Sequence, residues 1–385
     1  MTALRPRPPR SPDGPRPADG RERSGRAVRL LAALAVAWVG FTVGQRALSG
    51  HWWPLLAVDL MPPIAFVVVP AVLAAAAAVA GARAGRSGRP GGGSAVLVIC
   101  LALVALAVGW PRTGLVPQAL VPRDPAPGHD LRIVSWNTEW WGQYGTDRDD
   151  RFWAALRERD ADVYLLQEYL NGVDHRQENL RPVDELDRIR TEFPGYDVEI
   201  RGELITISRF PIEEATAVGP GAELGPEADW LDTYRAAKVL RTDINVDGQR
   251  LALYNVHIPV QIDPGWHLLT TDIPRLLQER ERSRAAQFAG LEQALAADPG
   301  PAVVAGDFNS TAVMGELDSL RGSLRDAAWA GDSVYPVSWS ERAALLGFWR
   351  LDWAFTTPEV DVRRYDLVPM GDLSDHRSQV IEVAL

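Results

Sequence analysis

The sequence contains very little cysteine and lysine, which many folds and binding sites use. Cys100 is the only cysteine among 385 residues, and this excludes an intramolecular disulfide framework and any metal site built from cysteines. Lys238 is the only lysine. Hydrophobic residues make up 46% of the chain and charged residues 23%, a composition that excludes a disordered polymer and a coiled-coil rod. The sequence therefore predicts a globular fold that does not depend on cysteine.

Length and charge distribution indicate two parts with different surroundings. At 385 residues the chain exceeds one ordinary domain and suits one of roughly 250 residues plus a second part. Residues 1–128 hold 14 basic and 5 acidic residues, whereas residues 129–385 hold 26 basic and 45 acidic ones. A basic N-terminal part is typical of membrane association, and an acidic C-terminal part repels nucleic-acid backbones. Nonspecific nucleic-acid binding is therefore disfavoured.

Long apolar runs predict a membrane anchor over residues 30–111. Residues 1–29 carry eight arginines and no apolar periodicity, so we expect a disordered basic tail there. Three uncharged stretches follow, each near the ~20 residues that a bilayer-spanning helix needs: Leu30 to Gln45, Leu60 to Ala82 and Ser94 to Pro111. We expect three transmembrane helices, then a proline-rich linker over residues 112–129 and a folded domain over residues 130–385.

The arginine positions predict how the anchor is oriented, because arginine stays preferentially on the cytoplasmic side. The tail has eight arginines and the second loop, residues 82–93, has three, whereas the first loop has only Arg46. This pattern predicts a cytoplasmic N-terminus and a C-terminal domain outside the cytoplasm. Trp52, Trp53 and Trp110 fall near the outer ends of the spans, where indole rings favour the membrane interface.

Two isolated charges have an ordinary and a functional interpretation. Asp59, at the edge of the second apolar stretch, is either a buried functional carboxylate or an interfacial residue, and we expect the interfacial one. Lys238 lies within a predicted strand. We expect it to be exposed to solvent and not to bind phosphate.

After residue 130 the pattern predicts an α/β domain in which sheets form the core and helices lie outside. Helices are expected over Asp149 to Arg159 and Leu276 to Ala297. Strands are expected over Leu131 to Trp136, Val163 to Leu166, Leu204 to Ser208, Ala237 to Ile244, Arg250 to His257, Ala302 to Ala305, Leu351 to Phe355, Val360 to Val368 and Ser378 to Val383.

Acidic, amide and imidazole residues recur where these strands begin or end. A rigid sheet fixes the loops that adjoin its strand ends, so side chains in several such loops can lie close together. Each residue alone is typical of a turn, but as a set they offer only oxygen and imidazole donors. Such a set predicts a metal-assisted hydrolytic site that suits Mg²⁺ or Mn²⁺. Its members are Asn137, Glu168, His257, Asp307, Asn309, Asp352, Asp375 and His376.

The segments SWNTEWWG, DVYLLQE, GELITISRFPI, YNVHIP, VVAGDFNS, RLDWAF and SDH occur in this order. As a set they resemble the endonuclease/exonuclease/phosphatase superfamily, also called the deoxyribonuclease I-like family, over residues 130–385. The resemblance implies a four-layered αββα sandwich of two packed, mostly antiparallel sheets. It also implies cleavage of phosphoester bonds with a divalent metal ion.

The resemblance implies a metal site at the ends of the first two strands. Glu168 would be the principal Mg²⁺ (or Mn²⁺) ligand, with Asn137 beside it as a ligand or as a residue that orients it. Asp375 would be available to the metal or to bound water.

The same resemblance implies the catalytic groups. Asp307 would orient or deprotonate the attacking water, and Asn309 would donate its amide to a phosphoryl oxygen. His376, held by Asp352, would act at the scissile phosphate, and either Asp307 or His376 is the general base. His257 would stabilise phosphoryl oxygens or protonate the leaving group, and Asn255 would support it at the substrate.

Three functions are compatible with this sequence. We expect a membrane-anchored phosphodiesterase or phosphatase outside the cytoplasm, acting on a small phosphoester or a lipid head group and in contact with the lipid bilayer. One alternative is an extracytoplasmic nuclease, which the acidic domain disfavours. The other is a non-catalytic binding or scaffold domain, which the complete set of catalytic residues disfavours.

Overall fold

The computed structural model describes residues 19–86, 92–121, 131–141, 146–172, 179–225, 227–262, 272–340 and 347–385. The chain forms two compact units. The helical unit consists of Met1–Gly44 and Phe66–Trp110, and the globular unit consists of Gln45–Ala65 and Pro111–Leu385.

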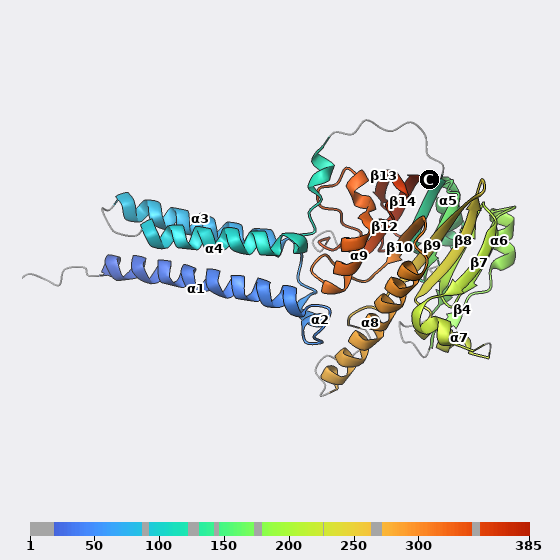
Figure 1. Cartoon of the computed structure of the whole chain (residues 1–385), viewed down its shortest axis with the longest axis horizontal. Coiled ribbons are helices and arrows are strands. Elements are labelled where there is room, and N and C mark those ends of the chain that lie inside the picture. The colour runs from blue at the N-terminus through green and yellow to red at the C-terminus, as the bar shows by residue number, and fades with distance from the viewer. Residues whose placement is uncertain are drawn as a thin grey trace, which may run out of the picture. The chain divides into compact units, whose positions relative to one another are not determined.

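The helical unit contains three long apolar helices (Figure 1). They are α1 (Asp19–Leu48), whose last residues belong to the globular unit, α3 (Ala65–Arg86) and α4 (Gly92–Gly109). Three stretches are long and apolar enough to cross a membrane, Arg26–Leu48, Ala65–Ala84 and Gly93–Arg112, which confirms the predicted number. The predicted tail is wrong in part, because α1 begins at Asp19 and its arginines and alanines are good helix formers. Residues 1–18 lie outside the described residues.

Two six-stranded sheets form the centre of the globular unit. The first has the order β13-β14-β1-β2-β6-β5 and the second β11-β12-β10-β9-β8-β7. In the first sheet the strands are β1 (Leu131–Asn137), β2 (Val163–Gln167), β5 (Asp197–Arg201), β6 (Leu204–Ser208), β13 (Asp361–Val368) and β14 (Ser378–Ala384). In the second they are β7 (Ile212–Ala217), β8 (Val239–Val246), β9 (Gln249–His257), β10 (Ala302–Asp307), β11 (Arg325–Asp326) and β12 (Asp352–Thr356). A separate pair joins β3 (Leu170–Asn171) and β4 (Arg181–Pro182).

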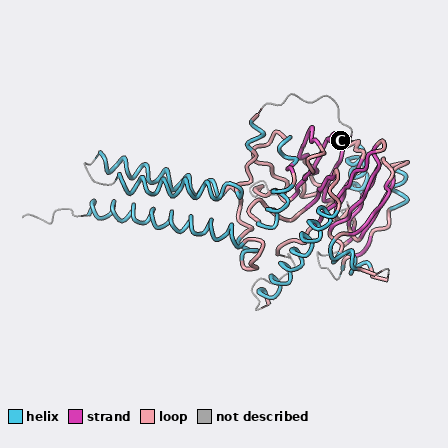
Figure 2. The backbone as a smooth tube through the Cα atoms, viewed as in Figure 1, coloured by secondary structure: helices cyan, strands magenta, loops and turns pink. Residues whose placement is uncertain are grey.

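Helices cover the outer faces of both sheets, as the ribbons and the tube show (Figures 1 and 2). On the first sheet, α5 (Thr146–Glu158) and α6 (Leu186–Glu192) bury Trp153 and Ile189. On the second, α8 (Ile273–Ala297) and α9 (Asp318–Ser323) bury Phe288 and Leu320. Shorter helices are α2 (Leu55–Val58) and α7 (Trp230–Ala236). A third apolar cluster, including Ile133 and Val303, packs between the sheets. The predicted four-layered sandwich is confirmed.

Strand pairing brings the predicted site residues to one end of both sheets. Within the first sheet β1 and β2 run parallel, and Asn137 pairs with Gln167. Within the second, β9 and β10 run parallel and place His257 beside Asp307, while antiparallel β12 places Asp352 on the other side of Asp307. The remaining pairings in the two sheets are antiparallel. These central strands therefore end or begin where the site lies.

The predicted boundaries of the anchor and the linker differ from those of the globular unit. Residues 45–65, expected within the anchor, belong to the globular unit. In the predicted linker, Arg112 forms an ion pair with Asp318 at 2.6 Å, and Val116 is buried against the core between the sheets. Hydrogen bonds to distant parts of the chain, which local composition does not reveal, fix these segments. Residues 122–130 lie outside the described residues.

Gly306 in β10 has a φ of +153°, and a Cβ there would lie 1.9 Å from the carbonyl oxygen of Val256 in β9. We expect Gly306→Ala to destabilise the protein by about 3 kcal/mol or more, because strand backbone must move to relieve the overlap. Denaturant unfolding of the detergent-solubilised chain measures this.

The matched control is Gly322→Ala, since a Cβ at Gly322 meets nothing within 4 Å. This helical substitution should be neutral or stabilising by up to about 1 kcal/mol. Equal unfolding midpoints for the two variants would contradict the steric argument.

Candidate active site

The site lies where the two sheets present their strand ends to each other. Asn137 ends β1 and Glu168 follows β2, whereas His257 ends β9 and Asp307 ends β10. The other members precede or follow strands of the same sheets: Asn309 after β10, Asp352 at the start of β12, and Asp375 and His376 before β14. The structure thus gathers eight of the nine predicted site residues.

One carboxylate oxygen, Oδ2 of Asp307, is the common neighbour of four of these side chains. Asn137 Nδ2 donates to it at 3.0 Å and Asn309 Nδ2 at 3.2 Å. The Nε2 atoms of His257 and His376 lie 3.6 and 3.7 Å from it. Because Asp307 is only 1% exposed, these polar neighbours must replace the water that its charge would otherwise hold.

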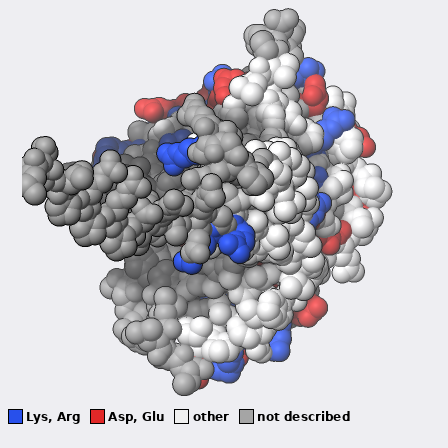
Figure 3. All heavy atoms as spheres, turned by 90° about the vertical axis from the view of Figure 1, so that its left-hand side faces the viewer, with Lys and Arg blue, Asp and Glu red and all other residues white. Residues whose placement is uncertain are grey.

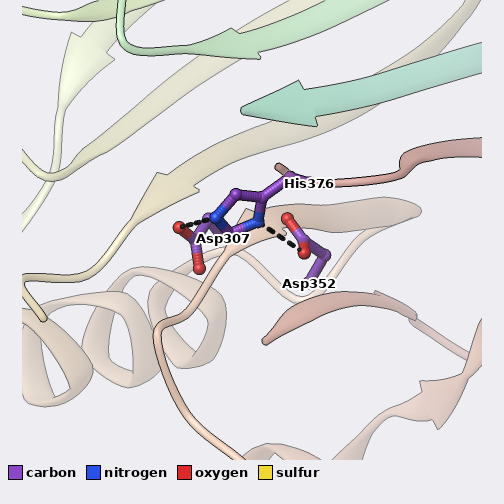
Figure 4. A group of neighbouring side chains, drawn as sticks. All are labelled: Asp307, Asp352 and His376. Carbon is purple, nitrogen blue, oxygen red and sulfur yellow. Dashed lines mark hydrogen bonds and ion pairs between the residues drawn. The ribbon is translucent and has the colours of Figure 1, made fainter. Parts of the chain in front are cut away.

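His376 lies between two carboxylates (Figure 4). Its Nδ1 is 2.9 Å from Asp352 Oδ2, so the Nδ1–H donates to Asp352 and Nε2 faces Asp307. Ser338 Oγ in turn accepts the backbone N–H of Asp352 at 3.0 Å. Burial opposes protonation of the imidazole, but Asp352 and Asp307 outweigh it and raise the pKa of His376 well above its usual value. The predicted His–Asp pair is present as a hydrogen-bonded unit.

His257 has a second carboxylate partner that the sequence did not indicate. Its Nδ1 lies 3.1 Å from Oε2 of Glu203, and the other carboxylate oxygen of Glu203 binds Nζ of Lys238. Burial alone would raise the pKa of Glu203, yet His257 and Lys238 lower it to about 2. Lys238 is 5% exposed, so the expectation of a solvent-exposed lysine was wrong. The sequence feature that could have pointed to this pair is the position of Glu203 directly before the apolar run LITIS. Its partner, Lys238, is 35 residues away.

Glu168 offers the most suitable position for a divalent cation. One of its oxygens accepts Asn137 Nδ2 and the other accepts the N–H of Trp140, both at 3.0 Å. Burial raises the pKa of Glu168, and a bound cation would offset that cost by stabilising the charged carboxylate. Asn137 donates to both Glu168 and Asp307. In this geometry it orients two carboxylates.

A second group compatible with a metal ion is formed by Asp307, Asp352 and His376, whose ligand atoms lie within 4.8 Å of one another. Oδ1 of Asp352 is buried and has no hydrogen-bond partner among the described residues. The Glu168 position offers carboxylate oxygens, which fit Mg²⁺ or Mn²⁺, whereas the second group adds the imidazole of His376.

Asp375 lies at the more open side of the site, with its side chain 26% exposed. Its Oδ2 accepts the indole N–H of Trp339 at 2.7 Å, and its Oδ1 is 3.9 Å from Nε2 of His376. Its backbone N–H donates to Oε2 of Glu139 at 3.1 Å. Trp339 and Glu139 were not predicted as site residues, because 36 and 236 residues separate them from Asp375.

The two predicted substrate-binding asparagines lie in different surroundings. Asn309 borders Asp307 and also donates from Nδ2 to the carbonyl of Ile258 at 3.0 Å. Asn255 is fully buried between the sheets, where its amide accepts from Gln167 and donates to the carbonyls of Leu166 and Ile205. The prediction that Asn255 contacts substrate was wrong, because its side chain is inaccessible and joins the two sheets.

Comparisons with known proteins concern this part of the chain. The profile described as the Endonuclease/Exonuclease/phosphatase family matches residues 134–376. A search of the curated proteins gives no match. One similar solved structure is an endonuclease/exonuclease/phosphatase from Bacteroides vulgatus, 15% identical, with a TM-score of 0.48, covering 66% of this chain and 98% of that one.

Two other solved structures are similar over the same share of the chain. One is the mannosyl-6-phosphatase of Bacteroides thetaiotaomicron, which is 16% identical with a TM-score of 0.44, covering 66% of this chain and 100% of that one. The other is a humanized TDP2 of D. rerio, 17% identical with a TM-score of 0.42, covering 66% of this chain and 99% of that one.

The buried Lys238–Glu203 pair predicts a large stability loss when the lysine is removed. We expect Lys238→Met to cost about 3–5 kcal/mol, because the change leaves the Glu203 carboxylate buried without its ammonium partner. Arg151→Met is the control, since its ion pair with Asp372 joins side chains that are 53% and 62% exposed and should contribute less than about 1 kcal/mol. Urea unfolding of both variants tests this. Similar losses of stability in the two variants would show that the Lys238–Glu203 pair contributes no more than an exposed ion pair.

Proposed function

The chain belongs to the endonuclease/exonuclease/phosphatase family, and on that premise we propose a membrane-anchored, divalent-metal-dependent phosphoesterase whose globular unit lies outside the cytoplasm. Its membership makes it a hydrolase that acts on phosphoester bonds. The observation that carries the proposal is the pair of carboxylate-backed imidazoles that flank the Oδ2 atom of Asp307.

These side chains suit in-line attack of water on a phosphate. Oδ2 of Asp307 and Nε2 of His376 lie 3.7 Å apart. A water molecule that contacts both atoms can give its proton to Asp307, or to His376 when the imidazole is neutral. Asp352 holds His376 through Nδ1 and stabilises the imidazolium that forms if His376 is the base.

The opposite side of Asp307 suits the phosphoryl oxygens and the leaving group. Burial opposes protonation of His257, but Glu203 at Nδ1 and Asp307 outweigh it and raise the pKa of the imidazole. The protonated ring carries an Nε2–H that can act as a donor. Asn309 donates its side-chain amide to Asp307 Oδ2 and to the carbonyl of Ile258, and so orients Asp307. A preorganised donor such as protonated His257 stabilises the charge that develops in the transition state.

The metal proposal concerns Glu168 and Asp375 as ligands, with Asn137 orienting Glu168. Mg²⁺ or Mn²⁺ held there would polarise a phosphoryl oxygen and offset its negative charge. The oxygen-only donors and the raised pKa of Glu168 support this.

A small or lipid-derived phosphoester suits the globular unit better than nucleic acid does. Residues 129–385 carry an excess of 19 acidic residues, whereas duplex binding requires a basic surface. On the one face drawn in Figure 3, the basic side chains of the described residues form separate small groups, and acidic side chains lie near those at the rim. The three apolar helices and the arginine distribution support anchoring and the outward orientation.

We expect Glu168→Ala to abolish both metal binding and turnover, since this change removes the principal charged ligand. The measurements are calorimetric titration of the full chain with Mg²⁺ or Mn²⁺, and hydrolysis of bis-p-nitrophenyl phosphate, p-nitrophenyl phosphate, sphingomyelin, an inositol phosphate and plasmid DNA. Glu359→Ala, at an exposed loop position, is the matched control.

The panel also separates the candidate functions. Preference for plasmid DNA would favour the nuclease, and a folded chain that binds no metal and cleaves nothing would favour the scaffold. Unchanged metal affinity in Glu168→Ala would refute the assigned ligand.

Removal of the imidazole should lower kcat and leave metal binding intact. We expect His376→Ala to reduce kcat by about 10²–10⁴-fold, the usual contribution of one general acid or base. Steady-state kinetics on the preferred substrate measure this, with His51→Ala, an exposed histidine, as control. A loss no greater than that of the control would remove His376 from the mechanism.

A further inference from the structure

The last turn of α1 and the segment that joins it to α3 are part of the globular unit. We call Gln45–Ala65 the membrane-proximal loop. We call residues 309–316 the catalytic-side loop, because they follow Asp307 and Phe308 and begin with Asn309. The two loops are more than 240 residues apart in sequence and are joined by hydrogen bonds.

Three close contacts hold the loops together. Gln45 Nε2 donates to the carbonyl of Val313 at 2.6 Å, and the N–H of Gly315 donates to Oγ of Ser49 at 2.8 Å. The backbones approach so closely that a Cβ on Gly315 would lie 2.1 Å from the carbonyl oxygen of Ser49. Gly315 is therefore required for this contact.

Asp59 fixes the side chains that make these contacts. Its carboxylate accepts Gln45 Nε2 at 2.9 Å and the hydroxyl of Ser49. The three side chains form a buried polar cluster, each no more than 3% exposed. Burial raises the pKa of Asp59 to about 6, against the effect of the two hydrogen bonds. The expectation of an interfacial Asp59 was wrong, because the carboxylate is enclosed by hydrogen-bond donors.

The catalytic-side loop is held from its other side by helix α8. Arg284 is fully buried and forms an ion pair with Glu316. Its Nη2 also donates to Oγ of Ser310 at 2.6 Å, and Ser310 is the residue after Asn309. The loop is thus held between α8 and the membrane-proximal loop, with Asn309 at its start bound to Asp307 through its backbone N–H at 2.8 Å.

We propose that Gln45, Ser49 and Asp59 are positioning residues of the active site, which hold residues 313–315 so that Asn309 and Asp307 keep their geometry. The proposal rests on the hydrolytic function of Asp307 and Asn309. It gives the segment that joins α1 to α3 a role in the active site of the globular unit.

The sharpest test is Gly315→Ala in the full-length protein in detergent, because the added methyl group must separate the two loops. We expect kcat for the preferred phosphoester to fall on the order of 10–100-fold, since displacements near 1 Å in a catalytic group have effects of this size. The affinity for Mg²⁺ should stay within about twofold, because Glu168 lies on the other sheet. Gly322→Ala, six residues from the end of the catalytic-side loop, is the matched control.

A second variant covers the case in which Gly315→Ala does not fold. Asp59→Ala removes the acceptor for both side chains and should lower kcat with Mg²⁺ affinity retained, whereas Asp59→Asn keeps one acceptor oxygen and should recover part of the activity. Equal kcat values for Gly315→Ala, Asp59→Ala and the Gly322→Ala control would overturn the proposal.

Hydrogen exchange separates failure of this inference from failure of the proposed function. The amides of residues 309–316 should exchange faster in Asp59→Ala than in the wild type, and those of β1 should not change. If the wild type hydrolyses none of the phosphoesters, the proposed function fails and the exchange result still decides whether the loops are coupled. Unchanged exchange in residues 309–316 would refute the coupling.

Discussion

The structure depends on a single buried carboxylate oxygen that both sheets share. Oδ2 of Asp307 is approached by Asn137 and His376 from the first sheet and by His257 and Asn309 from the second. An ionised carboxylate in this position is costly unless donors surround it, so the ends of the two sheets must keep their spacing. Gly306, which lets β10 approach β9, and Asn255, which joins the sheets below the site, both serve that requirement.

Charge balance at this point favours a cation. Among the described residues, and leaving aside Arg350, which is paired with Asp326, the buried ionisable groups at the site are four carboxylates, one ammonium and two imidazoles: Glu168, Glu203, Asp307 and Asp352, with Lys238, His257 and His376. Asp375 adds a fifth carboxylate at the open side. Even with both imidazoles protonated, negative charge is in excess, and a phosphate substrate would increase it. A divalent cation would offset this excess and make phosphate binding favourable.

The parts that the sequence predicted are those with a local signal. Alternating apolar runs placed β1, β2, β6, β9, β10, β12 and β14 within a few residues, and the polar residues at their ends identified the site. Glu203 and Lys238 were missed because each reads as an ordinary surface charge until its partner is known, and the partner lies on another strand. Asn255 was misplaced because a local pattern was misleading. It lies two residues before His257, so both side chains are on the same side of β9. At this end of the strand, however, Asn255 is still buried and only the last residue, His257, is partly exposed.

Contacts between distant parts of the chain, which the sequence does not reveal, also determine where the globular unit begins. Hydropathy divides the chain at residue 111, but Gln45, Ser49 and Arg112 bind Val313, Gly315 and Asp318. Without residues 45–65, the carbonyl of Val313 and the N–H of Gly315 would lose their partners. Removal of the segment would also uncover these groups to water, and the loop that starts at Asn309 would lose one of the two elements that hold it. The segment 45–65 therefore belongs to the same unit as the loop that follows Asp307, so a chain cut at the apparent linker lacks hydrogen-bond partners that this loop has in the full sequence.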